Sequence, residues 1–177
     1  DFSTDVDGWF EYLGSTISWQ SDGTALLMGG DSGPFSSFDG YSDTWPGTWY
    51  AEIDIYLDPA ALALGEGFDY SVAASKSDGS HLRDYIFHVT KDTSTDTLLV
   101  AGSNNSNFTP REDLENINHY EVTTAGWYTM QHKFYDAGGH LAVDLNLLNS
   151  DGTVLFTETR ENTSDSIPDV VGGNLYA

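Results

Sequence analysis

Strict alternation of apolar and polar side chains over residues 48–59 constrains the fold of this chain more than any other feature. One alternating set is Trp49, Ala51, Ile53, Ile55 and Leu57, and the other is Tyr50, Glu52, Asp54, Tyr56 and Asp58. A period of two residues is typical of a β-strand with one buried and one exposed face. The exposed face then carries three carboxylates and two tyrosines, which makes it the first candidate for a functional surface.

Turn signals divide the rest of the chain into further short β-rich runs. The tripeptide Ser-Asp-Gly occurs at residues 21–23, 77–79 and 150–152, each time between strand-forming residues. Asp-Gly suits a tight hairpin because a type I′ turn needs positive φ at both central positions. No segment of helical length keeps a 3.6-residue period. The sequence therefore predicts one all-β domain over residues 1–177, with roughly ten antiparallel strands in two packed sheets.

The composition excludes several kinds of partner and chemistry. The chain carries 28 acidic residues against 6 basic ones, a formal net charge of -22. This field repels phosphate backbones and anionic lipid surfaces, so we expect no nucleic-acid partner. The longest apolar run, residues 60–64, is too short to cross a bilayer, so no membrane insertion is expected. Because the chain has no cysteine, disulfides and thiolate chemistry are excluded.

Both ends of the sequence have the pattern expected of a module within a longer protein. Residues 172–177 have the pattern of the start of another strand, and the sequence begins abruptly at Asp1-Phe2, so any export signal is expected to have been removed or to lie outside it. We therefore expect a module of a longer secreted or cell-surface protein, with other domains of that protein as its neighbours.

Two stretches resemble known carbohydrate-recognising families. Residues 1–30 resemble the first strands of jelly-roll carbohydrate-binding modules, through Phe2 and the pair Gly8-Trp9. Residues 48–148 are similar to the concanavalin A-like lectin and glucanase superfamily in their long amphipathic strands. The resemblance implies an all-β fold, an antiparallel two-sheet jelly-roll β-sandwich. It also implies a lectin-like module that binds a polysaccharide or another glycan.

An enzyme on the same fold is the first alternative. Glucanases of that superfamily carry two glutamates around an aspartate on one strand, and Glu52 with Asp54 matches the first half of that motif. Position 56 is tyrosine, and the next carboxylate on the face, Asp58, lies six residues from Glu52. Six residues of strand span about 20 Å, whereas retaining hydrolysis needs carboxyls about 5 to 5.5 Å apart. The broken motif disfavours a glycoside hydrolase.

A polysaccharide lyase is a weaker alternative. Alginate-type lyases on jelly rolls use Arg, Gln, His and Tyr side chains, and this chain has Arg83, His88, Gln131, His132 and Tyr135. Residues an odd number of positions apart on one strand face opposite ways, so Arg83 opposes His88 and Gln131 opposes His132. The net charge also opposes a polyanionic substrate. A third alternative is an adhesive or structural module that binds protein.

Binding without catalysis needs only aromatic rings and planar hydrogen-bonding groups, because sugars present C–H faces and hydroxyls. Along residues 127–135 the even-numbered positions are the more apolar set. Trp127, Gln131 and Tyr135 are therefore expected to face outward, whereas His132 is expected to be a buried, hydrogen-bonded histidine. These outward side chains form one floor with residues 50–58 if the two strands belong to the same sheet.

Three further residues complete the predicted carbohydrate site. His88 is expected to face outward from the run 81–90, and the two long loops supply Trp45 for ring stacking and Asn104 for hydroxyl groups. The predicted carbohydrate-binding residues are thus Trp45, Glu52, Asp54, Tyr56, His88, Asn104, Trp127, Gln131 and Tyr135. An ordinary exposed sheet face with cross-strand polar pairs fits the same pattern, and the sequence leaves that alternative open.

A structural calcium ion is predicted near the N-terminus. The segment Asp5-Val6-Asp7-Gly8 resembles the opening of a calcium loop, with Asp5 and Asp7 as the metal ligands. It lacks the third oxygen ligand and the terminal glutamate of an EF-hand. Position 3 is serine, where the carbohydrate-binding modules often have a glutamate that helps to hold calcium. On the strength of the segment 5–8, the prediction is one Ca²⁺ ion held by the N-terminal acids.

Overall fold

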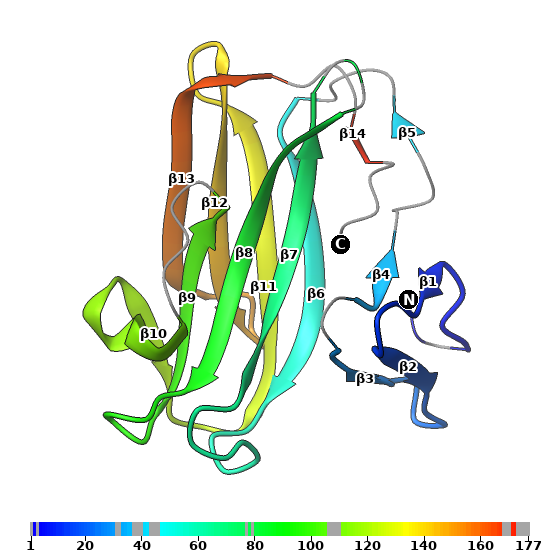
Figure 1. Ribbon diagram of the computed structural model, residues 1–177, viewed down its shortest axis with the longest axis vertical. Coiled ribbons are helices and arrows are strands. Elements are labelled where there is room, and N and C mark those ends of the chain that lie inside the picture. The colour runs from blue at the N-terminus through cyan, green and yellow to red at the C-terminus, as the bar shows by residue number, and fades with distance from the viewer. Residues whose placement is uncertain are drawn as a thin grey trace.

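The computed structural model describes residues 2, 4–30, 33–36, 41–42, 47–76, 78, 80–105, 111–167 and 171–172. Eight longer strands form two four-stranded sheets (Figure 1). Their bounds are β6 Trp49–Leu57, β7 Gly67–Ser75, β8 His81–Lys91, β9 Leu98–Asn104, β10 His119–Val122, β11 Gly126–Asp136, β12 His140–Asn149 and β13 Val154–Ser166. The one helical element in the described chain is a 3₁₀ helix, η1, at Arg111–Asn116. The predicted all-β class is therefore confirmed.

Each sheet is built mainly from consecutive hairpins. The front sheet of Figure 1 has the strand order β10-β9-β8-β7, and the back sheet has the order β13-β12-β11-β6. Every pairing in both sheets is antiparallel. The exception to the consecutive order is β6, which pairs with β11 although the whole front sheet lies between them in the sequence. The antiparallel pairing is thus confirmed, and the jelly-roll connectivity stays a prediction.

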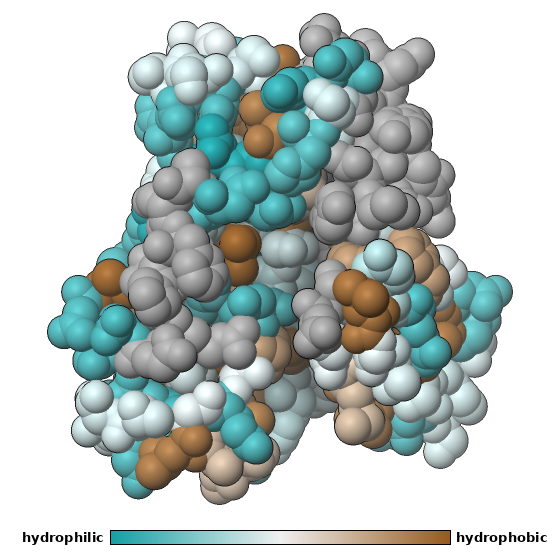
Figure 2. All heavy atoms as spheres, viewed as in Figure 1, coloured by the Kyte–Doolittle hydropathy of each residue, from teal (hydrophilic) through white to brown (hydrophobic). Residues whose placement is uncertain are grey.

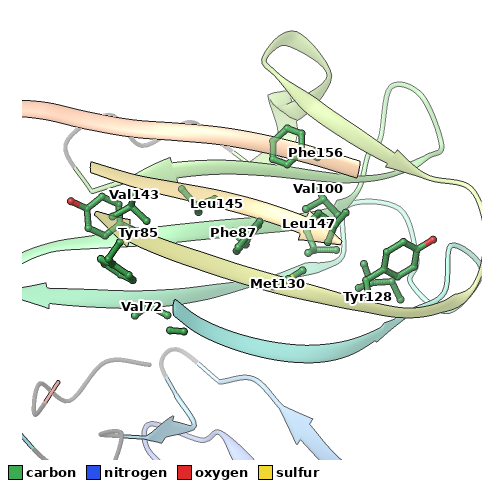
Figure 3. Close-up of a cluster of buried hydrophobic side chains, with 14 of the residues drawn as sticks. Val72, Tyr85, Phe87, Val100, Tyr128, Met130, Val143, Leu145, Leu147 and Phe156 are labelled. Atoms are coloured by element: carbon green, nitrogen blue, oxygen red, sulfur yellow. The ribbon is translucent and has the colours of Figure 1, made fainter. Parts of the chain in front are cut away.

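The two sheets pack face to face through one hydrophobic core, in a β-sandwich-like arrangement (Figure 3). The front sheet contributes Val72, Tyr85, Phe87, Val89 and Val100, and the back sheet contributes Met130, Phe134, Val143, Leu145 and Leu147. The ring of Trp49 stacks on Phe134 with centroids 4.1 Å apart, and Tyr85 meets Phe134 edge-on at 5.6 Å. Since one residue of slip would turn this core outward, the packing fixes the register of each strand.

A buried ion pair also joins the two sheets. Arg83 on β8 donates two hydrogen bonds to the carboxylate of Asp165 near the end of β13, both of 2.6 Å. Only 4% of the Asp165 side chain and 14% of the Arg83 side chain are exposed. The bidentate geometry is the strongest form of such a contact, so it holds the end of β13 against the front sheet.

A second, smaller apolar cluster covers part of the outer side of the front sheet. Leu99 and Ala101 of β9 pack there against Leu114 of η1 and against Ile117. All seven residues of β9 are consequently buried, on both faces of the strand. The back sheet differs in this respect. Along its edge strand β6, exposed outward residues alternate with more buried inward residues.

Six short strands lie beside the two sheets. They are β1 Trp9–Phe10, β2 Thr16–Trp19, β3 Ala25–Met28, β4 Phe35–Ser36, β5 Tyr41–Ser42 and β14 Val171–Gly172. They pair as β1 with β4, β2 with β3, and β5 with β14. Leu26 and Met28 of the β2–β3 hairpin are exposed, and Figure 2 shows apolar residues at the surface of this region. The main core is therefore formed by β6 to β13.

Candidate functional site

The candidate site is the outer face of the back sheet, which we call the polar face. It consists of Tyr50, Glu52, Asp54, Tyr56, Trp127, Thr129, Gln131, Lys133, Tyr135, Asp144, Asn146, Thr157 and Thr159. The β6–β11 register places Tyr56 opposite Trp127 and Glu52 opposite Gln131. Because the side chains of directly opposed residues lie close together, each such pair forms one row across the sheet.

One row of hydrogen bonds crosses all four strands of the polar face. Gln131 donates through Nε2 to Glu52 Oε1 at 2.6 Å. Its Oε1 accepts a hydrogen bond of 2.8 Å from Asn146 Nδ2, and Asn146 Oδ1 accepts one of 2.7 Å from the Thr157 hydroxyl. Every amide in the row thus has a defined orientation, and the groups are held in place before any ligand arrives.

A second polar row centres on Asp144. Its Oδ1 accepts hydrogen bonds from Thr159 Oγ1 at 2.7 Å and from the Tyr135 hydroxyl at 3.2 Å. Its Oδ2 lies 3.4 Å from Lys133 Nζ, which also lies 5.0 Å from the centre of the Tyr135 ring. Burial, together with the nearby Asp144 carboxylate, raises the pKa of the Tyr135 phenol. Tyr135 is therefore a protonated donor at neutral pH.

Exposed aromatic rings flank the polar rows. Tyr56 and Trp127 form an edge-to-face pair with centroids 5.6 Å apart and an interplanar angle of 73°. Tyr56 is 53% exposed and Trp127 is 47% exposed, although rings of this size are usually more buried. Tyr50, at the other end of β6, is also exposed. Between the rings, Thr129 Oγ1 donates a hydrogen bond of 2.6 Å to Asp54 Oδ1.

The structure brings six of the nine predicted carbohydrate-binding residues together on the polar face. They are Glu52, Asp54, Tyr56, Trp127, Gln131 and Tyr135. Trp45 lies outside the described residues. Asn146 and Thr157 complete the row that starts at Glu52, and neither was among the predicted residues. The alternation of side chains along residues 140–149 could have identified Asn146, since it places Asn146 and Asp144 on the same side of the strand.

The prediction that Asn104 lies in a loop is wrong. Asn104 is the last residue of β9 and is only 5% exposed. Its partner across the strands is Tyr85 on β8, in the front sheet. The strand continues further into the Asn-rich segment than its composition suggested, because pairing with β8 overrides the turn preference of asparagine.

The prediction that His88 faces outward onto the same floor is also wrong. Its side chain does point away from the main core residues Phe87 and Val89, as strand parity requires. However, β8 belongs to the front sheet, and His88 has no exposed surface. Strand parity indicates which face a residue occupies, but not whether a second layer covers that face.

His88 lies within a hydrogen-bonded chain of three side chains. Its Nδ1 is 2.7 Å from Asp69 Oδ1, and its Nε2 is 2.6 Å from Ser103 Oγ. The order of atoms is that of a Ser-His-Asp hydrolase triad. Both Ser103 and His88 are fully buried, so a substrate has no access to the hydroxyl in this structure. The two hydrogen bonds therefore satisfy the buried polar groups of His88 and Ser103.

The residues considered for a lyase do not converge. Arg83 is paired with Asp165 between the sheets, and Gln131 lies on the polar face. His132 lies in the core, where its Nε2 donates to the Tyr85 carbonyl at 3.0 Å. The prediction that His132 is buried and hydrogen-bonded is confirmed. Distributed in this way, the five side chains cannot contact one sugar ring.

Asp5 and Asp7, the predicted calcium ligands, are both exposed. Asp5 Oδ1 accepts a hydrogen bond of 3.1 Å from the backbone N–H of Asp7, and Oδ2 accepts one of 3.0 Å from Thr4 Oγ1. In the part of the chain that the structure describes, no group of three or more His, Cys, Asp or Glu side chains is placed to hold a metal ion. Two exposed carboxylates fall short of the six to eight oxygens that calcium takes, so the calcium ion stays a prediction.

No protein-family model matches the chain, and no curated protein and no solved structure is significantly similar to it. Among the described residues, no helix combines the length and the apolar character required to span a bilayer. Function is therefore inferred from the chemistry of the polar face itself.

Proposed function

We propose that this chain is a carbohydrate-binding, lectin-like module of the jelly-roll type that holds a polysaccharide or glycan on its polar face. We further propose that it works within a secreted or cell-surface protein. The observation that carries the proposal is the combination of half-exposed aromatic rings with cross-strand rows of oriented amide, carboxylate and hydroxyl groups on one sheet face. Sugar recognition needs both elements, because rings cover C–H faces and polar groups bind hydroxyls.

The polar rows leave capacity for a ligand. Glu52 and Asp54 each use one carboxylate oxygen for a cross-strand hydrogen bond from Gln131 or Thr129. A carboxylate has a second oxygen and further lone pairs, so both side chains can still accept hydrogen bonds from sugar hydroxyls. Tyr56 and Trp127 lie at the end of the same two strands and supply the stacking surface.

Charge narrows the class of glycan. Carboxylates outnumber the single lysine of the polar face, and the whole chain has a net charge of -22. Uronate-rich and sulfated polysaccharides would meet this field as anions, at a cost in affinity. Neutral glycans and those built from amino sugars are therefore the ligands that fit the face.

Binding without hydrolysis agrees with the incomplete glucanase motif on β6. Glu52 and Asp54 match its first half, and position 56 is tyrosine where a second glutamate is needed. A glycoside hydrolase remains the alternative, and it predicts released reducing ends that Glu52→Gln would abolish.

Alanine in place of Tyr56 should weaken retention of the protein in a polysaccharide affinity gel. Loss of one stacking ring costs about 1.4 kcal/mol, or roughly tenfold in the dissociation constant. The matched control is Tyr12→Ala, since Tyr12 and Tyr56 are both 53% exposed and Tyr12 lies among the N-terminal strands. We expect the control to migrate as the wild type does.

A wild-type protein that runs freely through gels of neutral and amino-sugar polysaccharides would refute carbohydrate binding. It would favour the adhesive module, whose partner is protein. If the protein is retained and the two tyrosine variants migrate alike, carbohydrate is bound elsewhere than on the polar face.

A further inference from the structure

An apolar pocket lies at the end of β6, lined by residues of both the polar face and the main core. Its volume is about 190 Å³, and it is lined by Tyr56, Leu57, Asp58, Ala61, Leu62, Phe68 and Leu98. These residues come from the end of β6, the turn that follows it, and the beginnings of β7 and β9. Tyr56 belongs both to the pocket and to the aromatic pair with Trp127. A glycan stacked on that pair would therefore lie beside the pocket.

The lining of the pocket selects against sugar hydroxyls. Leu62, Phe68 and Leu98 offer no hydrogen-bonding side-chain groups, and a hydroxyl placed among them would lose its contacts with water. The polar side chains of the lining are Tyr56 and Asp58. Asp58 uses Oδ1 to accept a hydrogen bond of 2.8 Å from the backbone N–H of Ala60, which fixes the position of its carboxylate. The pocket therefore suits a small group that has a methyl end and an N–H donor.

We propose that this pocket receives the acetamido group of an N-acetylated amino sugar in the glycan bound on the polar face. The methyl group packs against Leu62 and Phe68, and the amide N–H donates to the Asp58 carboxylate. The sugar ring that carries the group stacks on Tyr56. This inference rests on the proposed carbohydrate binding and names the substrate class of that same site.

The test compares two oligosaccharides of equal length and the same β-1,4 linkage. One is built from N-acetylglucosamine and the other from glucose, so they differ only in the group at C2. By isothermal titration calorimetry we expect the wild type to bind the N-acetylated oligosaccharide about tenfold more tightly, because it buries a methyl group and gains a hydrogen bond to a charged acceptor.

The variant Ala61→Phe is designed to fill the pocket, because Ala61 is an exposed residue of its lining. Ala61→Phe should reduce affinity for the N-acetylated oligosaccharide to that for the glucose one, and should leave binding of the glucose oligosaccharide unchanged. The matched control is Ala63→Phe, since Ala63 lies in the same turn and is exposed but does not line the pocket. The control should keep the tenfold preference.

The possible outcomes separate this inference from the proposed function. Equal binding of both oligosaccharides by the wild type would overturn the acetamido pocket and leave carbohydrate binding intact. A preference that survives in Ala61→Phe would overturn it too, since the pocket would then be filled. Failure to bind either oligosaccharide or any other glycan would refute the proposed function itself, and this inference with it.

Discussion

Alanine in place of Asp165 should lower the free energy of unfolding by about 3 kcal/mol, the largest loss that we expect from a single polar substitution. The change removes both 2.6 Å hydrogen bonds to Arg83 and leaves the guanidinium without its carboxylate in a largely buried position between the sheets. Because Arg83 is 14% exposed and can reach some water, we place the loss at the lower end of the range for buried pairs. Urea denaturation followed by tryptophan fluorescence measures it.

The matched control for this prediction is Glu161→Ala. Glu161 accepts a hydrogen bond of 2.6 Å from His140, but its side chain is 46% exposed. An exposed pair contributes at most about 1 kcal/mol, so the control should change little. Equal losses from Asp165→Ala and Glu161→Ala would show that the contact between β8 and β13 does not hold the sheets together.

Stability should fall steeply below pH 6 because of His132. Complete burial lowers the pKa of His132 from 6.5 to about 3, and the hydrogen bond to the Tyr85 carbonyl only partly opposes this effect. Between these two values the unfolded chain binds a proton that the folded chain does not. The contribution of His132 to the free energy of unfolding is therefore fully present above pH 6.5. As the pH falls from 6.5 toward 3, the free energy of unfolding decreases by about 1.4 kcal/mol per pH unit from this residue alone.

The variant His132→Leu separates this contribution from the carboxylates. Leucine cannot be protonated, so the free energy of unfolding of the variant should vary less with pH. The difference between wild type and variant should change by roughly 2 to 3 kcal/mol between pH 6 and pH 4. The control His119→Leu makes the same change in a half-buried ring. A pH-independent difference between wild type and His132→Leu would contradict the prediction.

Local alternation predicted the polar face because two of its strands, β6 and β11, are amphipathic with a period of two. For β6, residues 48–59 give the strand, its inward set and its outward set directly. For β11, parity placed Trp127, Gln131 and Tyr135 outward, as the structure has them. A period of two is enough here because the inner face of each strand packs on a continuous core.

Alternation within a segment does not indicate which strands share a sheet, or which elements cover each face of that sheet. His88 has the parity of an outward residue, but β8 pairs with β7 and β9 and not with β6. Leu114 and Ile117 cover part of that outer side, and they come from a connection whose sequence carries no strand periodicity. Such long-range contacts follow from the packing of the whole chain, and alternation within one strand does not report them.

The most direct test of carbohydrate binding on the polar face is an NMR titration. The ¹⁵N-labelled protein would be titrated with the soluble oligosaccharide of whichever polysaccharide retards it in the affinity gel. We predict that the side-chain amide of Gln131 and the indole N–H of Trp127 shift first and most, because both lie on the outward side of β11. Shifts confined to the N-terminal strands, for example at the indole of Trp19, with both reporters on β11 unmoved, would contradict the assignment of the site to this sheet.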